Sequence, residues 1–185
     1  MSEKQSFLKD KHILAVDDEP DILDTIVDLL GDADVDTALD YESASEKIKR
    51  QRYDLVILDI MGVNGLQLLE EAVAKDIPAV MLTAHAISPE TLMDSIQKGA
   101  MSYLPKESLA DLDHLLNELL GAYYGGEPPW KLLFGKLGDY FDQRFGPGWQ
   151  EKDRAFWSKF SRNYQIGKGI QERLKHDKRI LDKGI

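Results

Sequence analysis

The chain has 185 residues, of which 43% are hydrophobic and none is cysteine. This composition supports a packed core and excludes a largely disordered chain, and the missing cysteines exclude disulfides and thiolate chemistry. The net charge of −10 is unevenly spread, because residues 150–185 carry ten Lys or Arg against five Asp or Glu, which leaves −15 on residues 1–149.

Short apolar runs alternate with helical patterns along the first 124 residues. The runs predict strands over residues 12–17, 33–38, 54–59, 77–83 and 101–106. Apolar residues at helical spacing predict helices over residues 18–32, 40–52, 65–76, 88–100 and 108–124. Suitable residues stand at the helix ends: Pro20 in a first turn, Ser88 and Ser108 as N-caps, and Gly31 and Gly99 as terminators.

The alternation of strands and helices is typical of an α/β protein. The run DLVILD at residues 54–59 is apolar on both faces, as a central parallel strand should be. We predict a five-stranded parallel, doubly wound sheet of the flavodoxin-like order 2-1-3-4-5, with five helices covering its two faces. In such a sheet, the loops at the carboxyl ends of the strands carry the site.

The stretch GGEPPW at residues 125–130 predicts a hinge between two units, residues 1–124 and residues 125–185. The second is a small α-helical region with helical patterns over residues 130–145, 149–165 and 170–183. We interpret its aromatic residues as a core packed on itself or on the first unit, rather than as a ligand site; they are Trp130, Phe134, Tyr140, Phe141, Phe145, Phe156, Trp157, Phe160 and Tyr164. We interpret its basic residues as a solvated face rather than a nucleic-acid patch; they are Arg154, Lys159, Arg162, Lys168, Arg173, Lys175, Lys178 and Arg179.

Polar residues stand where four of the predicted strands end. Asp17 and Asp18 follow the first strand, Asp59 the third, Thr83 the fourth and Lys106 the fifth. Three carboxylates in one crevice repel each other, and a divalent cation with a preference for oxygen ligands, such as Mg²⁺, resolves the conflict. A hydroxyl and an ammonium group suit phosphate oxygens. The set therefore indicates Mg²⁺ and a phosphoryl group, with one carboxylate as the nucleophile that forms an aspartyl-phosphate.

Residues 12–121 resemble the receiver domain of two-component response regulators. The motifs are LAVDDEP on the first strand, LVILD on the third, VMLTA on the fourth and GAMSYLPKE on the fifth, in that order. The resemblance implies that Asp59 is the phospho-acceptor and that Asp17 and Asp18 are the acid pair that binds Mg²⁺ together with Asp59. It also implies that the backbone carbonyl of Met61 is a metal ligand.

The same resemblance implies roles for residues of the last two strands. Thr83 and Lys106 would contact the phosphoryl oxygens, and Tyr103 would be the switch residue, whose ring turns inward when the Thr83 hydroxyl shifts toward the phosphate. The chain departs from the family at two places. The loop IMGVNG lacks the usual proline and reaches its turn early, and Lys106 is followed by Glu107 instead of proline.

The resemblance implies a two-component response regulator. A sensor histidine kinase would phosphorylate Asp59, and the change would alter a surface that binds a downstream protein partner or forms a phosphorylation-linked homodimer. Such a protein is no enzyme beyond catalysing its own phosphorylation and dephosphorylation. No apolar stretch reaches the roughly 18 residues of a membrane span, and the polar start MSEKQSFLKDKH has no apolar signal core. We expect a cytoplasmic location, no membrane partner and no nucleic acid partner.

Two alternative functions use parts of the same pattern. Phosphatases of the haloacid dehalogenase type also combine Asp, Thr or Ser, Lys and Mg²⁺, but they need a second Asp two residues after the nucleophile. This chain has Met61 after Asp59 and Glu19 after Asp17. A DNA-binding transcriptional regulator would use the basic C-terminal helices, although they show no helix-turn-helix pattern.

Overall fold

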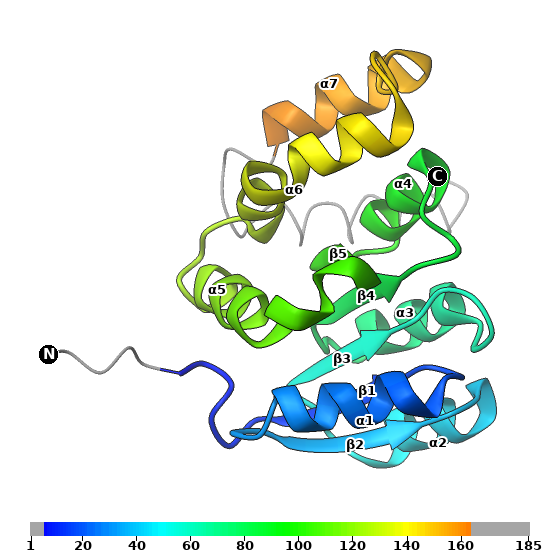
Figure 1. Cartoon of the computed structure of the whole chain (residues 1–185), viewed down its shortest axis with the longest axis vertical. Coiled ribbons are helices and arrows are strands. Elements are labelled where there is room, and N and C mark those ends of the chain that lie inside the picture. Colours follow the sequence, from blue (N-terminus) through cyan, green and yellow to red (C-terminus); the bar gives the residue numbers. More distant parts are fainter. Residues whose placement is uncertain (1–5, 164–185) are drawn as a thin grey trace, which may run out of the picture.

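Five parallel strands form one sheet in the order β2-β1-β3-β4-β5 in the computed structural model of the protein, which describes residues 6–163 (Figure 1). The strands are β1 (His12–Val16), β2 (Asp34–Ala38), β3 (Leu55–Leu58), β4 (Ala79–Thr83) and β5 (Ser102–Pro105). Every residue of β3 and β4 is buried, because these two apolar runs lie in the middle of the sheet. The predicted fold class and strand order are confirmed.

Helices cover both faces of this sheet. α1 (Pro20–Leu29) packs beside α5 (Leu112–Tyr124) on one face (Figure 1). On the other face, α2 (Tyr41–Arg50), α3 (Gly65–Ala74) and α4 (Pro89–Gln97) follow one another. This arrangement results from right-handed crossovers between parallel strands, and it places all five strand carboxyl ends at one edge of the sheet.

The predicted N-caps differ in outcome. The Ser88 hydroxyl accepts the backbone N–H of Thr91 at 3.1 Å, so this cap of α4 is confirmed. Ser108 is not a cap, because residues Lys106–Asp111 form a short 3₁₀ helix, η1, and α5 begins only at Leu112. The tighter turn starts the helix with Leu112 facing the core, where it is fully buried.

A pair of helices follows the sheet domain and packs next to β5 and α5 (Figure 1). α6 (Pro129–Phe145) and α7 (Arg154–Asn163), with the 3₁₀ helix η2 (Glu151–Asp153) before α7, form a hairpin closed by aromatic rings. The Phe134 and Trp157 rings are edge to face at 6.0 Å, and those of Trp130 and Phe160 at 6.1 Å. The aromatic residues of the described hairpin therefore form a core, as predicted. Tyr164, the helix expected over residues 170–183 and the basic residues from 168 onward lie outside the described residues.

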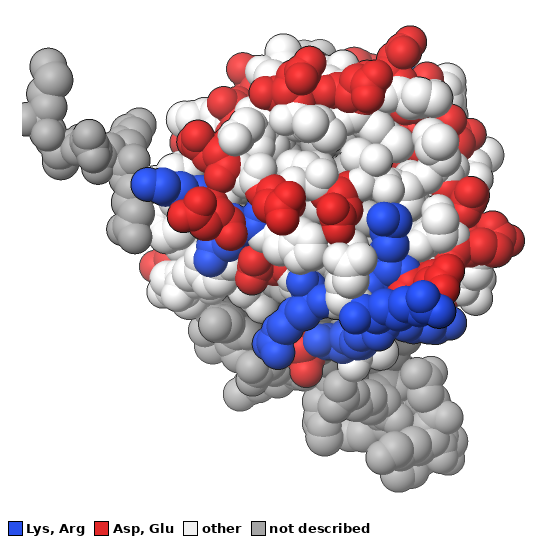
Figure 2. All heavy atoms as spheres, turned by 90° about the horizontal axis from the view of Figure 1, so that it is seen from below, with Lys and Arg blue, Asp and Glu red and all other residues white. Residues whose placement is uncertain are grey.

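Acidic side chains are spread over the face seen from below, and basic side chains gather in one band there (Figure 2). The last turn of α2, at the lower end of the molecule in Figure 1, carries Lys47, Lys49 and Arg50. Positive charge is favourable at this position because the carbonyl end of a helix is negatively polarised. No helix within residues 6–163 has the length and apolar character needed to cross a bilayer.

A small polar cluster joins the amino-terminal ends of β1 and β2. His12 Nε2 lies 3.0 Å from a carboxylate oxygen of Asp36, and the Tyr53 hydroxyl donates to the same oxygen at 2.8 Å. The rings of His12 and Tyr53 pack with centroids 4.4 Å apart. Burial lowers the His12 pKa, but the hydrogen bonds to Asp36 and to the Arg52 carbonyl and the charges of Asp36 and Asp34 together outweigh this and raise the pKa above 6.5.

Replacing His12 by Phe keeps a ring on Tyr53 but removes the titrating group. In the wild type, the charged pair stabilises the fold fully below the unfolded pKa, and this stabilisation is lost as the pH rises through the raised folded pKa. We therefore expect the wild-type free energy of unfolding to fall, relative to His12→Phe, between about pH 6 and about pH 8. Urea denaturation at several pH values measures it, and parallel pH profiles would contradict the assignment.

Candidate functional site

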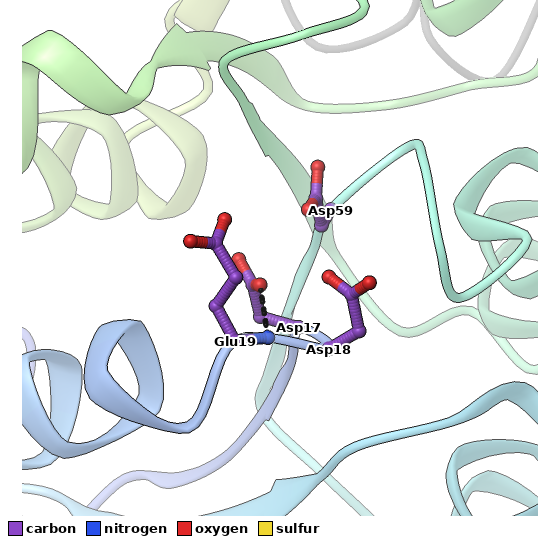
Figure 3. Close-up of side chains that lie close together, drawn as sticks. All are labelled: Asp17, Asp18, Glu19 and Asp59. Carbon is purple, nitrogen blue, oxygen red and sulfur yellow. Dashed lines mark hydrogen bonds between the residues drawn. The ribbon is translucent and has the colours of Figure 1, made fainter.

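Four carboxylates meet at the carboxyl edge of the sheet. Ligand atoms of Asp17, Asp18, Glu19 and Asp59 all lie within 4.8 Å of one another (Figure 3). Adjacent parallel strands bring them together, since β1 and β3 pair in register up to Val16 and Leu58 and the acids directly follow. Asp17 and Asp59 are buried, whereas Asp18 and Glu19 are exposed.

The ammonium group of Lys106 lies among these carboxylates. Its Nζ is 2.8 Å from Asp17, 3.1 Å from Asp59 and 3.0 Å from Glu19. Lys106 directly follows β5, two strands away from Asp59, and its long side chain spans that distance. Burial lowers the Lys106 pKa, but hydrogen bonds to the three carboxylates outweigh this and raise it, so the lysine is firmly charged.

The two buried aspartates are held in fixed orientations. One oxygen of Asp59 accepts the backbone N–H of Ile60 at 2.8 Å, and the other faces Lys106. One oxygen of Asp17 accepts the backbone N–H of Glu19 at 2.9 Å (Figure 3). Burial raises the Asp17 pKa, the Asp59 charge raises it further, and the hydrogen bond to Lys106 opposes them. The site therefore carries more negative charge than one lysine balances.

Thr83 ends β4, the strand between those that supply Asp59 and Lys106. Its side chain is fully buried, and its hydroxyl has no hydrogen-bond partner among the described residues. A buried unpaired hydroxyl is costly, so such groups mark places where a further polar ligand is expected. A phosphoryl oxygen on Asp59 is a suitable partner.

The carboxylates also fit a hard divalent cation. Mg²⁺ prefers oxygen ligands and is held by one or two carboxylates and several waters. Asp17, Asp18 and Asp59 offer such oxygens, and their role as metal ligands stays a prediction. The Met61 side chain is 56% exposed, and the metal contact expected of its backbone carbonyl stays a prediction.

Tyr103 lies in β5 and is fully buried. Its hydroxyl is 2.8 Å from the Thr91 hydroxyl and donates to the Ala86 carbonyl at 3.3 Å. The backbone N–H of Ser88 donates to the Tyr103 hydroxyl at 3.4 Å. The ring is therefore tied to the segment that follows Thr83, and its role as a switch remains a prediction.

Two glycines near the acids were not predicted to matter. Gly62 has a φ of +81°, and a Cβ there would overlap the Asp18 carboxylate. A Cβ on Gly65 would overlap the backbone carbonyl of Asp59, so a residue predicted only as part of a turn is required by the site.

The sequence analysis also did not predict Glu19 as a partner of Lys106. The run of three acids at the end of β1 was the available signal.

Comparison with known proteins shows one consistent relationship. Residues 13–119 match the response regulator receiver domain family. The nitrogen assimilation regulatory protein NtrX of Azorhizobium caulinodans is 35% identical over 107 residues, which cover 54% of this chain and 23% of that protein. The DNA-binding response regulator MtrA of Mycolicibacterium smegmatis is 33% identical over 110 residues, or 54% of this chain and 48% of that protein. The chain thus spans about half or less of these relatives.

Solved structures agree with this relationship. A CheY-like receiver domain protein from Methanospirillum hungatei is 27% identical with a TM-score of 0.52, and the match covers 61% of this chain and 98% of that one. NtrX from Brucella abortus is 36% identical with a TM-score of 0.52, over 59% of this chain and 26% of that one. The family match ends at residue 119, before α6 begins at Pro129.

Substitution of Gly62 tests whether its backbone makes room for Asp18. We expect Gly62→Ala to lower the affinity for Mg²⁺ about tenfold or more, because Asp18 must move, as measured by isothermal titration calorimetry. Gly126→Ala is the matched control, since its φ of +78° is similar but no heavy atom would lie within 4 Å of the new Cβ. Both variants lose about 1–2 kcal/mol of stability through backbone strain. Equal Mg²⁺ affinities would contradict the role of Gly62.

Proposed function

The chain belongs to the response regulator receiver family of two-component systems, and we propose that Asp59 accepts a phosphoryl group from a sensor histidine kinase. One observation carries the proposal: the Asp59 carboxylate lies 3.1 Å from the Lys106 ammonium in a buried, strongly acidic site. A lysine held in this way neutralises negative charge at the acceptor. The family match and the buried Thr83 hydroxyl also support Asp59 as the phospho-acceptor.

The residues act on the phosphoryl group in distinct ways. An Asp59 oxygen attacks phosphorus, the bond from phosphorus to the donor breaks, and the donor leaves with its bonding electrons. The hydrogen bond from the Ile60 N–H fixes the carboxylate for an in-line approach. Lys106 then contacts one phosphoryl oxygen and the Thr83 hydroxyl donates to another, so charge neutralisation and positioning supply most of the catalysis.

Mg²⁺ would be held by Asp17, Asp18, Asp59 and the backbone carbonyl of Met61. When bound, the ion neutralises the carboxylates and the phosphoryl oxygens. Asp17 has a second task, because it also binds Lys106 at 2.8 Å and keeps that side chain directed into the site. The site thus needs both the ion and the lysine to balance its charge.

The output of the modified protein is a change of contact with a downstream protein partner. Tyr103 is the proposed switch residue, and a phosphorylation-linked homodimer is a further possible output of this family. We propose that residues 1–124 form the phospho-acceptor domain and residues 125–185 an extension that serves the output. We further propose a cytoplasmic location and no enzymatic activity beyond self-catalysed phosphorylation and dephosphorylation.

A DNA-binding output is the second candidate. Among the relatives, MtrA is named a DNA-binding response regulator and PhoB of Klebsiella pneumoniae, 33% identical over 123 residues, a transcriptional regulatory protein. The expectation that nucleic acid is no partner is therefore not supported. Within the described hairpin, Arg154 and Lys159 on α7 are exposed.

Replacement of the acceptor tests the proposed function. We expect acetyl phosphate with Mg²⁺ to produce an acid-labile phosphorylated form of the wild type and none of Asp59→Asn, because the amide is no nucleophile. Phosphate-affinity electrophoresis measures both. Asp28→Asn, which changes an exposed aspartate of α1 in the same way, should be phosphorylated like the wild type. Persistent phosphorylation of Asp59→Asn would refute the assignment.

The DNA-binding candidate is tested with the full chain. If it is correct, we expect a gel shift of duplex DNA that weakens steeply as salt is raised, because phosphate contacts release counterions. The net charge of −10 opposes such binding, so the titration starts at low salt. No shift at low salt, with or without acetyl phosphate, would dismiss this candidate.

A further inference from the structure

α6 packs against β5 and the residues just before it. Near the start of the strand, the Trp130 indole N–H donates to the Ala100 carbonyl at 3.0 Å. Within β5, the Tyr103 ring packs against the Phe141 ring of α6, with the two centroids 6.1 Å apart. Figure 1 shows α6 next to β5, with α7 on its far side.

A further residue of α6 reaches the segment that contains Lys106. The Tyr140 hydroxyl is buried without a hydrogen bond of ordinary geometry among the described residues. Burial raises the Tyr140 pKa, and the nearby Glu107 carboxylate raises it further. Glu107 directly follows Lys106 and stands where the family usually has proline. The end of β5 is thus flanked by α6 on the residues before and after the lysine.

Three apolar side chains of α6 are almost fully buried, in contacts with the sheet domain and with the aromatic core of the hairpin. Trp130, Leu133 and Phe141 are each at most 3% exposed. Burial of such side chains contributes about 1.5–3 kcal/mol each, whereas coupling between sites is typically about 1–3 kcal/mol in total. This burial favours an α6 that stays docked while it acts on the site.

We propose that α6 is a positioning element of the phosphoryl site: through Phe141 on Tyr103 and Tyr140 beside Glu107, it holds β5 so that Lys106 stays within reach of Asp59. This inference rests on the proposed function. It makes Phe141 and Tyr140 positioning residues outside the matched family region.

The test compares phosphorylation rates of full-length variants with acetyl phosphate and saturating Mg²⁺. We expect Phe141→Ala to be phosphorylated about fivefold more slowly or worse, and Phe141→Leu, which keeps most of the apolar volume, to fall between it and the wild type. Phe156→Ala is the matched control, since its ring packs within the hairpin on Trp157 and Phe160. The control should be phosphorylated like the wild type.

A second measurement, the affinity for Mg²⁺, distinguishes a loss of Lys106 positioning from a general loss of structure. The affinity for Mg²⁺ depends on the carboxylates, so all three variants should bind the ion as the wild type does. The inference is overturned if Phe141→Leu matches the wild type in rate, or if Phe156→Ala is slowed as much as Phe141→Ala. Should Phe141→Ala fail to fold, the phosphorylation rates of Phe141→Leu and Phe156→Ala are compared instead, and the inference requires that Phe141→Leu is the slower of the two. An unphosphorylated wild type would instead remove the proposed function, and the inference with it.

Discussion

The ammonium group of Lys106 is the contact on which the site depends. It joins acids from the ends of two strands that would otherwise repel each other, and it comes from a third strand at the edge of the sheet. The charge of the lysine is secure because hydrogen bonds to the carboxylates outweigh the cost of its burial. The same arrangement leaves an excess of negative charge that a divalent cation can balance. The fold contributes by placing the carboxyl ends of these strands at the same edge of the sheet.

The C-terminal hairpin extends this arrangement beyond the family's usual domain. Its first helix contacts Tyr103 in β5 and the Ala100 carbonyl just before this strand. The hairpin is therefore part of the environment of the site as well as a candidate for the output. An aromatic core of its own keeps α6 in place, because rings from α6 and α7 interlock edge to face.

Local sequence patterns predicted the strands and the five polar residues at their ends, because apolar runs and the polar residues after them are short-range features. The strand order was predicted from the fold class that the alternation of strands and helices indicates. The cap at Ser108 was wrong, since the chain leaves β5 in a 3₁₀ turn that places Leu112 in the core. The role of Gly62 was missed, because it depends on contact with Asp18, which is distant in sequence. The orientation of α6 was not predictable for the same reason: which aromatic face meets β5 is decided by tertiary packing.

The two edges of the sheet are protected in different ways. β2 carries Asp34 and Asp36, and charged side chains on an edge strand discourage pairing with another chain. β5 has no charged residue, and all four of its residues are buried although it pairs only with β4. Its protection comes from α6. A chain shortened at the glycines after α5 would therefore lose one of the helices that cover this apolar strand, and we expect it to self-associate more readily through the β5 edge.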